Sequence, residues 1–143
     1  MRINRIKIHE DGLNRFFGPL ESLIMGIMWD QKEATAKTVQ ALLEEELSYT
    51  AVMTVLNRLN EKDHLGKTTS GRGRGRITMY FVNQSKEQFL QEQTKIVTEE
   101  LIHEYGDLVV NHMVNALQDD ADPKLMMLLE ERIAKWRREK SNE

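Results

Sequence analysis

Apolar residues recur with the period of a helix between residues 18 and 62. One helical face is formed by residues at the spacing i, i+3, i+4 and i+7, namely Leu20, Leu23, Ile24, Ile27 and Met28. Pro19 stands at a position that suits the first turn of this helix. A second helix fits residues 36–47, and a third fits residues 49–62 with Ser48 as its N-cap. The pattern predicts three short helices around one core.

The hydrophobic period changes from helical to alternating after Gly66. One strand fits residues 65–69, a turn of glycines and arginines follows, and a return strand fits residues 77–82. The predicted fold class is therefore mostly α with a small β-hairpin. Three helices followed by a hairpin outline a winged helix-turn-helix domain over residues 18–84, and residues 1–17, which lack a helical period, are expected to form a loose N-terminal arm.

Residues 85–143 are predicted to form a helical region that cannot bury all its apolar surface alone. Ser85 and Gln88 have the spacing of a capping box, Gly106 is expected to break the helix that follows, and Asp122-Pro123 suits the start of a last helix. Because about sixty residues in three helices do not readily enclose such full apolar stripes, we expect a dimerisation domain that pairs with a second copy. The predicted interface comprises Phe89, Val97, Leu101, Leu108, Met113, Leu117, Leu125, Leu129, Ile133 and Trp136.

The composition excludes several classes of protein. The chain has 143 residues, a formal net charge of -3 and no cysteine, which removes disulfides and thiolate metal sites and fits a cytoplasmic protein. Its apolar runs are shorter than the roughly 20 residues of a membrane span, and its N-terminus lacks the apolar part of a secretory signal. His103 and His112 lack the spacing of a metal site, and no catalytic nucleophile with its base is recognisable. We expect no cofactor, no metal, no lipid membrane binding and no enzymatic activity.

Positive charge is concentrated in the predicted hairpin although the whole chain is acidic. Residues 1–84 carry 12 Lys and Arg against 10 Asp and Glu, whereas residues 85–143 carry 8 against 13. Between residues 67 and 82 there is no acid, and the cations are Lys67, Arg72, Arg74 and Arg76. The intervening glycines let the backbone approach a surface closely, and guanidinium groups match phosphate oxygens. The hairpin is predicted to contact DNA phosphates, with a merely solvated turn as the alternative.

The helix predicted at residues 49–62 has a polar face that suits DNA. This face carries Thr50, Thr54, Asn57, Arg58 and Glu61. Threonine hydroxyls and an arginine guanidinium can bond base edges or phosphates, and the amides of Ser48, Tyr49 and Thr50 at the helix start would attract a phosphate. An ordinary solvent face is the alternative. The occurrence of this polar face beside a cationic hairpin, at winged-helix spacing, favours DNA recognition.

Several short motifs follow one another in order along residues 18–84. "GPLE", "IMW" and "TAKTV" precede "SYTAVMTVLNRLNEKDHL", which a basic hairpin follows. Together they resemble the penicillinase-repressor (BlaI/MecI/CopY) family, in detail over residues 18–84 and as a helical tail over residues 85–140. The resemblance implies a homodimeric bacterial transcriptional repressor that occupies a dyad-symmetric double-stranded DNA operator.

The resemblance also implies contact residues and a means of release. Carried over by position, the recognition-helix contacts fall on Thr50, Ala51, Thr54 and Arg58. Ala51 departs from the family pattern, where a hydroxyl or a longer polar side chain is expected, so base contact there is open or limited to a thymine methyl. The cysteine motif of copper-responsive relatives is absent. Penicillinase repressors are cut by a membrane sensor protease in the dimerisation region, which implies such a protease as a partner.

Two other functions remain open from the residues alone. A winged helix could dock a protein and direct its arginines at an acidic surface, and negligible preference for any duplex would favour this reading. A nucleic-acid-processing enzyme would need an acidic metal cluster beside the basic hairpin, and the sequence shows none there.

Overall fold

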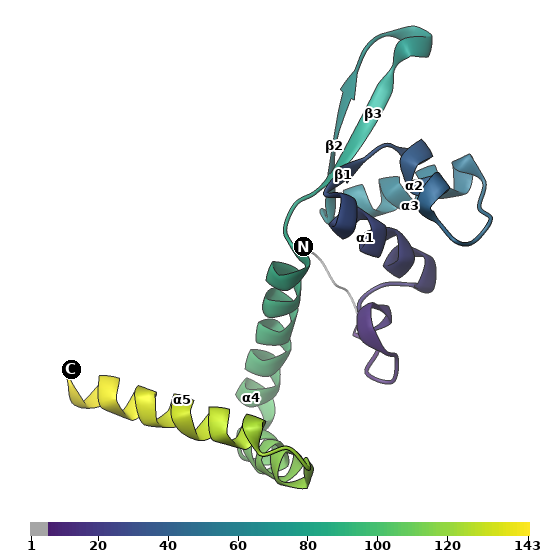
Figure 1. Ribbon diagram of the computed structural model, residues 1–143. Coiled ribbons are helices and arrows are strands. Elements are labelled where there is room, and N and C mark those ends of the chain that lie inside the picture. Colours follow the sequence, from purple (N-terminus) through teal and green to yellow (C-terminus); the bar gives the residue numbers. More distant parts are fainter. Residues whose placement is uncertain (1–5) are drawn as a thin grey trace. The chain divides into compact units, whose positions relative to one another are not determined.

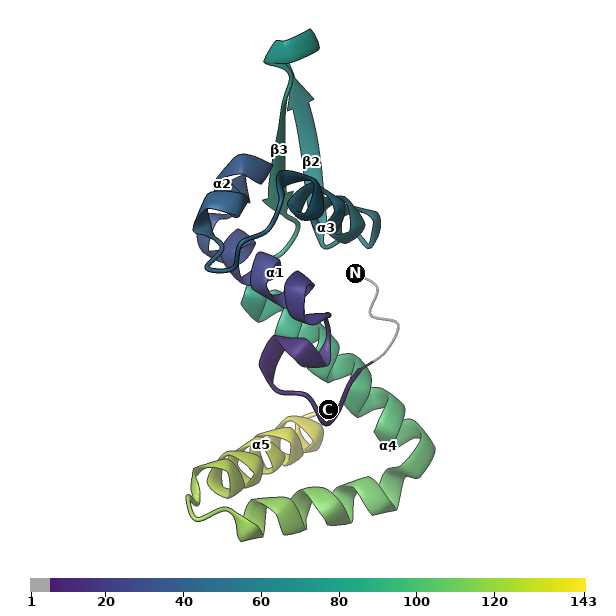
Figure 2. The same cartoon turned by 90° about the vertical axis from the view of Figure 1, so that its right-hand side faces the viewer.

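The computed structural model describes residues 6–143, which form parts of two compact units (Figures 1 and 2). The first unit runs to Leu90, and the second covers Gln91–Glu143. The first turn of the helix that follows residue 84 thus belongs to the first unit, although the sequence predicts a boundary between residues 84 and 85.

The first unit is a winged helix-turn-helix fold of three helices and a three-stranded antiparallel sheet. Its helices are α1 (Pro19–Gln31), α2 (Ala36–Leu42) and α3 (Tyr49–Glu61), and a 3₁₀ helix at Gly12–Arg15 precedes them. Its strands are β1 (Glu33–Ala34), β2 (Leu65–Ser70) and β3 (Ile77–Val82), in the order β1-β3-β2. The predicted helices and hairpin are confirmed. The two-residue β1 was not predicted, because so short a strand has no alternation to detect.

Side chains at the helix ends explain where the helices begin and stop. Thr35 Oγ1 accepts a hydrogen bond from Thr38 N at 3.3 Å, and Ser48 Oγ accepts one from Ala51 N at 3.1 Å. Helix α2 ends at Leu42, before the predicted residue 47, because Leu43 takes extended backbone (φ -70, ψ 131). Gln40 Nε2 donates to Leu47 O at 2.9 Å and ties the acidic loop back to α2.

Strands β2 and β3 form a hairpin, the wing, which pairs from Leu65–Val82 at its base to Ser70–Ile77 near its tip. Gly66 lies under the Phe81 ring, where any Cβ atom would collide with that ring. Gly71 has φ +84, a left-handed conformation that favours glycine. The wing is thus shaped by a close approach at its base and by a glycine-dependent turn at its tip.

The core of the first unit lies among the three helices and the base of the wing. Its fully buried members include Ile24, Met25, Met28, Val39, Val52, Leu56, Leu59, Leu65 and Tyr80. Each large apolar side chain contributes about 1.5–3 kcal/mol on burial. This core stabilises the unit while one face of α3 stays polar and exposed.

Two phenylalanines complete this core in places that were not predicted. Phe17 and Phe89 are 2% and 0% exposed, and their stacked rings have centroids 5.3 Å apart. The expectation of a loose arm is therefore wrong for residues 12–17, where Gly12–Arg15 form a 3₁₀ helix and Phe17 is buried in the core; for residues 1–5 it lies outside the described residues. The assignment of Phe89 to the dimer interface is also wrong, because the chain's own first unit already encloses that ring.

His64 lies in the same aromatic cluster, fully buried, with its ring centroid 4.9 Å from that of Phe17. Neither ring nitrogen has a hydrogen-bond partner among the described residues. Burial, and then the nearby Lys62 ammonium, lower the pKa of His64 from 6.5 to about 4. The folded chain therefore holds His64 neutral at pH values where the unfolded chain protonates it.

We expect this histidine to make the fold sensitive to acid. The free energy of unfolding has its full value with respect to His64 above pH 6.5. It decreases as the pH falls from 6.5 towards 4, because the unfolded state then binds one proton more than the folded state. The loss should approach about 3 kcal/mol. Urea unfolding of the wild type and of His64→Phe over this pH range measures it. The variant should lose less stability than the wild type, and equal losses would contradict the assignment.

The second unit contains most of α4 (Lys86–Asp119) and all of α5 (Lys124–Ser141). The predicted capping box is confirmed, since Ser85 N donates to Gln88 Oε1 at 2.9 Å and Gln88 N donates to Ser85 Oγ at 3.1 Å. The predicted break at Gly106 takes the form of a kink, with φ 16 and ψ -89, and the helix continues on both sides of it. Asp122 Oδ1 accepts from Lys124 N at 3.0 Å at the start of α5, where Pro123 holds the N-cap position.

The helices of the second unit leave many of their apolar side chains exposed. Residues 94–143 include no buried side chain. Large exposed apolar residues in this range include Leu101, Ile102, Leu108, Val110, Leu125, Leu128, Ile133 and Trp136. In the described part of the chain, no helix combines the length and apolar character needed to cross a membrane.

Candidate nucleic-acid interface

Helix α3 separates an apolar face in the core from a polar face in solvent. Val52, Val55, Leu56 and Leu59 are buried, whereas Thr50, Thr54 and Arg58 are exposed and Ala51 is half-buried. The spacing of four residues places the exposed three along one side of the helix. This surface is therefore accessible to a macromolecular partner.

The start of α3 offers backbone donors next to this polar face. Ser48 Oγ satisfies the amide of Ala51, and Ser48 O accepts from Val52 N at 3.1 Å. The amides of Tyr49 and Thr50 belong to the first turn, where backbone N–H groups lack partners within the helix. Tyr49 is 46% exposed and leaves this helix end open to solvent. Such a helix end favours an anion such as a phosphate.

The hydroxyl of Thr54 has a defined hydrogen-bonding role. Thr54 Oγ1 donates to the carbonyl oxygen of Thr50 at 2.9 Å. Because a hydroxyl has one hydrogen and two lone pairs, the exposed oxygen remains available as an acceptor. Thr54 can therefore accept from an exocyclic amine of a base, or pack its methyl group on a thymine.

Arg58 lies on the same side of α3 but already has a partner within the chain. Its Nη1 is 3.7 Å from Oε1 of Glu21, a largely buried residue of α1. Lys62 Nζ lies 3.3 Å from Oε2 of the same carboxylate. Glu21 thus joins α1 to the end of α3, and Arg58, whose side chain is 52% exposed, combines this contact with exposure to solvent.

The wing ends in a narrow tip that projects from the three helices (Figure 1), and Arg72, Arg74 and Arg76 belong to this tip. Residues 71–77 are all exposed, and a 3₁₀ turn at Gly73–Gly75 forms the bend. Within the described part of the chain, the structure shows no ion pair for Arg72, Arg74 or Arg76. The Thr69 and Thr78 hydroxyls lie 3.2 Å apart across the strands just below the tip. The hairpin thus holds three unpaired guanidinium groups at its end.

Asn57 lies on the side of α3 that faces the wing. The sequence predicts its place on the polar face of this helix but no contact for it. Its Oδ1 accepts from Tyr80 Oη of β3 at 2.8 Å and from Lys67 Nζ of β2 at 3.4 Å. Tyr80 is 1% exposed, and burial raises the pKa of its hydroxyl. The spacing of Asn57 from Thr54 placed it on this face, but nothing in the sequence indicated that a strand hydroxyl would meet it.

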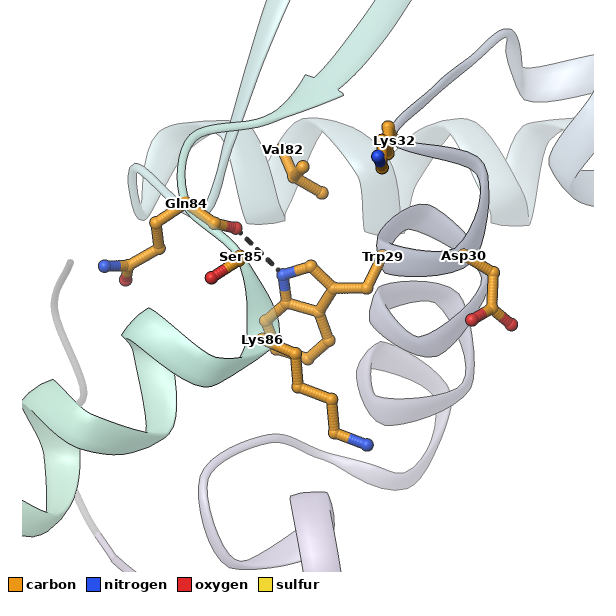
Figure 3. Close-up of a pocket in the computed structure, with 7 residues that line it drawn as sticks. All are labelled: Trp29, Asp30, Lys32, Val82, Gln84, Ser85 and Lys86. Carbon is orange, nitrogen blue, oxygen red and sulfur yellow. Dashed lines mark hydrogen bonds between the residues drawn. The ribbon is translucent and has the colours of Figure 1, made fainter.

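A pocket of about 500 Å³ lies elsewhere in the first unit, between the end of α1 and the start of α4 (Figure 3). Trp29 forms one wall, and its Nε1 donates to the carbonyl oxygen of Gln84 at 3.0 Å. This bond fixes the connection from β3 to α4.

No group of three or more His, Asp or Glu side chains in the described residues is placed to hold a metal ion.

Solved structures of several transcription regulators are similar to this chain at low sequence identity. They include PadR of Bacillus subtilis in complex with operator DNA (13% identity, 71% of this chain and 68% of that chain, TM-score 0.44). ZitR of Lactococcus lactis covers 81% of this chain and 84% of its own at 17% identity, with a TM-score of 0.41. A possible transcriptional regulator from Methanosarcina mazei Go1 covers 69% and 78% at 15% identity, with a TM-score of 0.45.

Sequence comparison identifies the family directly. The Penicillinase repressor family matches residues 17–135, which include the three helices, the wing, all of α4 and most of α5. No curated protein matches the chain in sequence. The match covers far more than half of the chain and agrees with the motifs in residues 18–84. The chain therefore belongs to the penicillinase repressor family and is a DNA-binding transcription regulator, not an enzyme.

Proposed function

We propose that this protein represses transcription as a homodimer on a dyad-symmetric operator. The observation that carries the proposal is the joint exposure, in one unit, of the polar side of α3 and of three unpaired arginines on the wing. A helix of this kind fits the major groove of DNA, and a wing beside it meets the sugar-phosphate backbone. Binding over a promoter would exclude the transcription machinery.

The proposed contacts fall into two groups. Thr50, Ala51 and Thr54 read base edges, and Arg58 bonds a base or a phosphate with the part of its guanidinium that Glu21 leaves exposed. The amides at Ser48, Tyr49 and Thr50 attract a phosphate. Lys67, Arg72, Arg74 and Arg76 bond phosphates and add affinity for any sequence.

The second unit supports pairing with a second copy. Its predicted interface residues other than Phe89 are all exposed or half-buried, so their side chains remain accessible. Around the kink, α4 carries an apolar groove of about 500 Å³ lined by Leu101, Leu108, Met113 and their neighbours. A single chain rarely exposes this much apolar surface. A symmetric dimer would cover these side chains and bring two α3 helices to one operator.

Selection from a pool of random duplexes tests the proposal. Purified protein should enrich a dyad-symmetric sequence, and its bound mass in analytical ultracentrifugation should be that of two chains per duplex. Enrichment of an asymmetric half-site by a single chain would remove the dimer from the proposal. Absence of any preferred duplex would overturn the proposal and favour a protein-docking winged helix.

Thr54→Val is expected to alter sequence preference and leave general affinity intact. The change keeps the size and one methyl group but removes the oxygen that accepts from a base. Preference at one base pair of each half-site should change by about 1–3 kcal/mol, measured by titrating operators substituted at single positions. Thr98→Val is a matched control, because Thr98 Oγ1 donates to Thr94 O at 2.7 Å in α4 just as Thr54 does in α3. Equal effects of both variants would assign the change to helix stability.

We further propose that cleavage in the second unit by a membrane sensor protease releases the operator. Family membership supports this route, and the kink at Gly106 offers an interruption in an exposed helix where a protease could gain access to the backbone. Immunoblotting under inducing conditions should show a fragment that contains the first unit as operator occupancy falls. Induction with the chain intact would exclude proteolysis.

A further inference from the structure

A hydrogen-bonded group links the recognition helix to the wing. Asn57 of α3 accepts at its Oδ1 from Tyr80 Oη at 2.8 Å and from Lys67 Nζ at 3.4 Å. Tyr80 belongs to β3 and Lys67 to β2, and these residues pair directly in the sheet. The three side chains therefore converge where α3 faces the exposed part of the wing.

The two donors determine which way the Asn57 amide is turned. An ammonium group can only donate, so the Asn57 atom that faces Lys67 must be the oxygen. The buried Tyr80 hydroxyl reinforces this orientation at the shorter distance. The Nδ2 group of Asn57 must then point away from both, and the described residues supply no acceptor for it. Asn57 is half-buried and Lys67 is exposed, so solvent or a ligand can reach these donors.

The position of this amide matches a particular part of a bound duplex. Asn57 follows Thr54 by three residues on the polar side of α3, and Lys67 is where β2 begins its exposed run. If α3 lies in the major groove and the wing beside it, as in the proposed function, the DNA strand at the edge of that groove would pass between the two elements. The groups that this strand presents along its edge are phosphate oxygens, which are acceptors only.

We propose that Asn57 Nδ2 and Lys67 Nζ together bind one DNA phosphate in each half-site, and that Tyr80 is the positioning residue that holds the amide. The proposal rests on the proposed function, since it requires α3 and the wing to engage the same duplex. One donor is neutral and the other is cationic. Their effects on affinity and on salt dependence therefore differ.

Substitution of each donor should separate these effects. Asn57→Ala should weaken binding about 10-fold for each half-site, as expected for a hydrogen bond to a charged group, with an unchanged slope of log affinity against log salt. Lys67→Ala should weaken binding and also reduce the slope by about 0.9 for each phosphate contact that is lost. Asn111→Ala and Lys124→Ala, at exposed positions of the second unit, are the matched controls and should have little effect.

Two further variants test the orientation of the amide. Asn57→Asp keeps the oxygen that Tyr80 and Lys67 bond but replaces the donor with a negative charge, and it should weaken binding more than Asn57→Ala does. Tyr80→Phe removes only the hydroxyl that holds the Asn57 oxygen, and it should reproduce much of the Asn57→Ala loss, with far-ultraviolet circular dichroism unchanged. Asn57→Gln, which keeps the amide on a longer side chain, should restore part of the affinity.

Single methylphosphonate substitutions along the operator identify the phosphate. One position in each half-site should weaken the wild type strongly, weaken Asn57→Ala less because only the Lys67 contact remains to be lost, and have little further effect on the Asn57→Ala/Lys67→Ala double variant. Additive losses at every phosphate, or an Asn57→Ala variant as tight as the wild type, would overturn this inference and leave the proposed function standing. A wild type that selects no duplex at all would instead overturn the proposed function.

Discussion

Replacement of Arg72, Arg74 and Arg76 together by alanine should reduce DNA affinity on every sequence by at least about 100-fold, because charge-assisted bonds contribute about 1.5–3 kcal/mol each. All three side chains are exposed at the wing tip, and the described residues hold no ion-pair partner for them. Their loss should also lower the slope of log affinity against log salt by about 0.9 for each phosphate contact removed. Fluorescence anisotropy with operator and random duplexes, at several salt concentrations, measures both quantities.

The matched control removes the same charge elsewhere. Lys86→Ala, Lys95→Ala and Lys124→Ala together delete three exposed cations of α4 and α5 and should leave the salt slope nearly unchanged. If the control and the wing variant gave equal losses, net charge would explain the effect. If the wing variant lost sequence preference but kept its affinity, the arginines would read bases.

Leu108→Glu should convert the protein to monomers and lower its affinity for a full operator by about 1000-fold, within the range that linking two binding modules provides. Leu108 is 58% exposed in the single chain, so the substitution costs the monomer little. In the proposed dimer it would place a carboxylate in an apolar interface, where burying an unpaired charge is strongly unfavourable. Sedimentation and operator titration measure the two effects.

A duplex with one half-site makes this test specific. The Leu108→Glu variant should bind it about as tightly as the wild type does, since a single half-site engages one first unit in either case. His103→Glu introduces the same charge at an exposed polar position of α4 and should leave the dimer intact. Dimers of Leu108→Glu that still bind the operator tightly would place the interface elsewhere.

The first unit was predictable from its sequence because local signals agreed with one another. Pro19, Ser48 and the Ser85–Gln88 pair marked helix starts that the structure confirms, and the change of period after Gly66 marked the wing. The end of α2 was missed because Leu47 continues the apolar spacing of the helix. Its backbone already lies in a loop, which is held by the hydrogen bond from Gln40 to the Leu47 carbonyl oxygen. Apolar spacing reports burial and does not by itself report backbone conformation.

The candidate site was predictable in its parts and not in its connections. The polar spacing of α3 identified Thr50, Thr54 and Arg58 as a surface, and the structure leaves all three exposed. Contacts between residues far apart in the chain could not be predicted, because a single sequence does not show which side chains meet in the fold. The Glu21–Arg58 pair and the Tyr80–Asn57 bond are of this kind. Phe89 was misplaced for the same reason, since an apolar residue on a helix fits a core or an interface equally well.

The enclosed Phe89 ring has a consequence for how the repressor could be switched off. The last buried apolar side chain of the first unit's core lies in the opening turn of α4, and the unit ends at Leu90. If a protease severs α4 beyond that point, each N-terminal fragment retains a complete DNA-binding unit. Cleavage would then act by separating two intact DNA-binding units from one another. Each N-terminal fragment would leave the promoter by rapid dissociation, with its structure preserved.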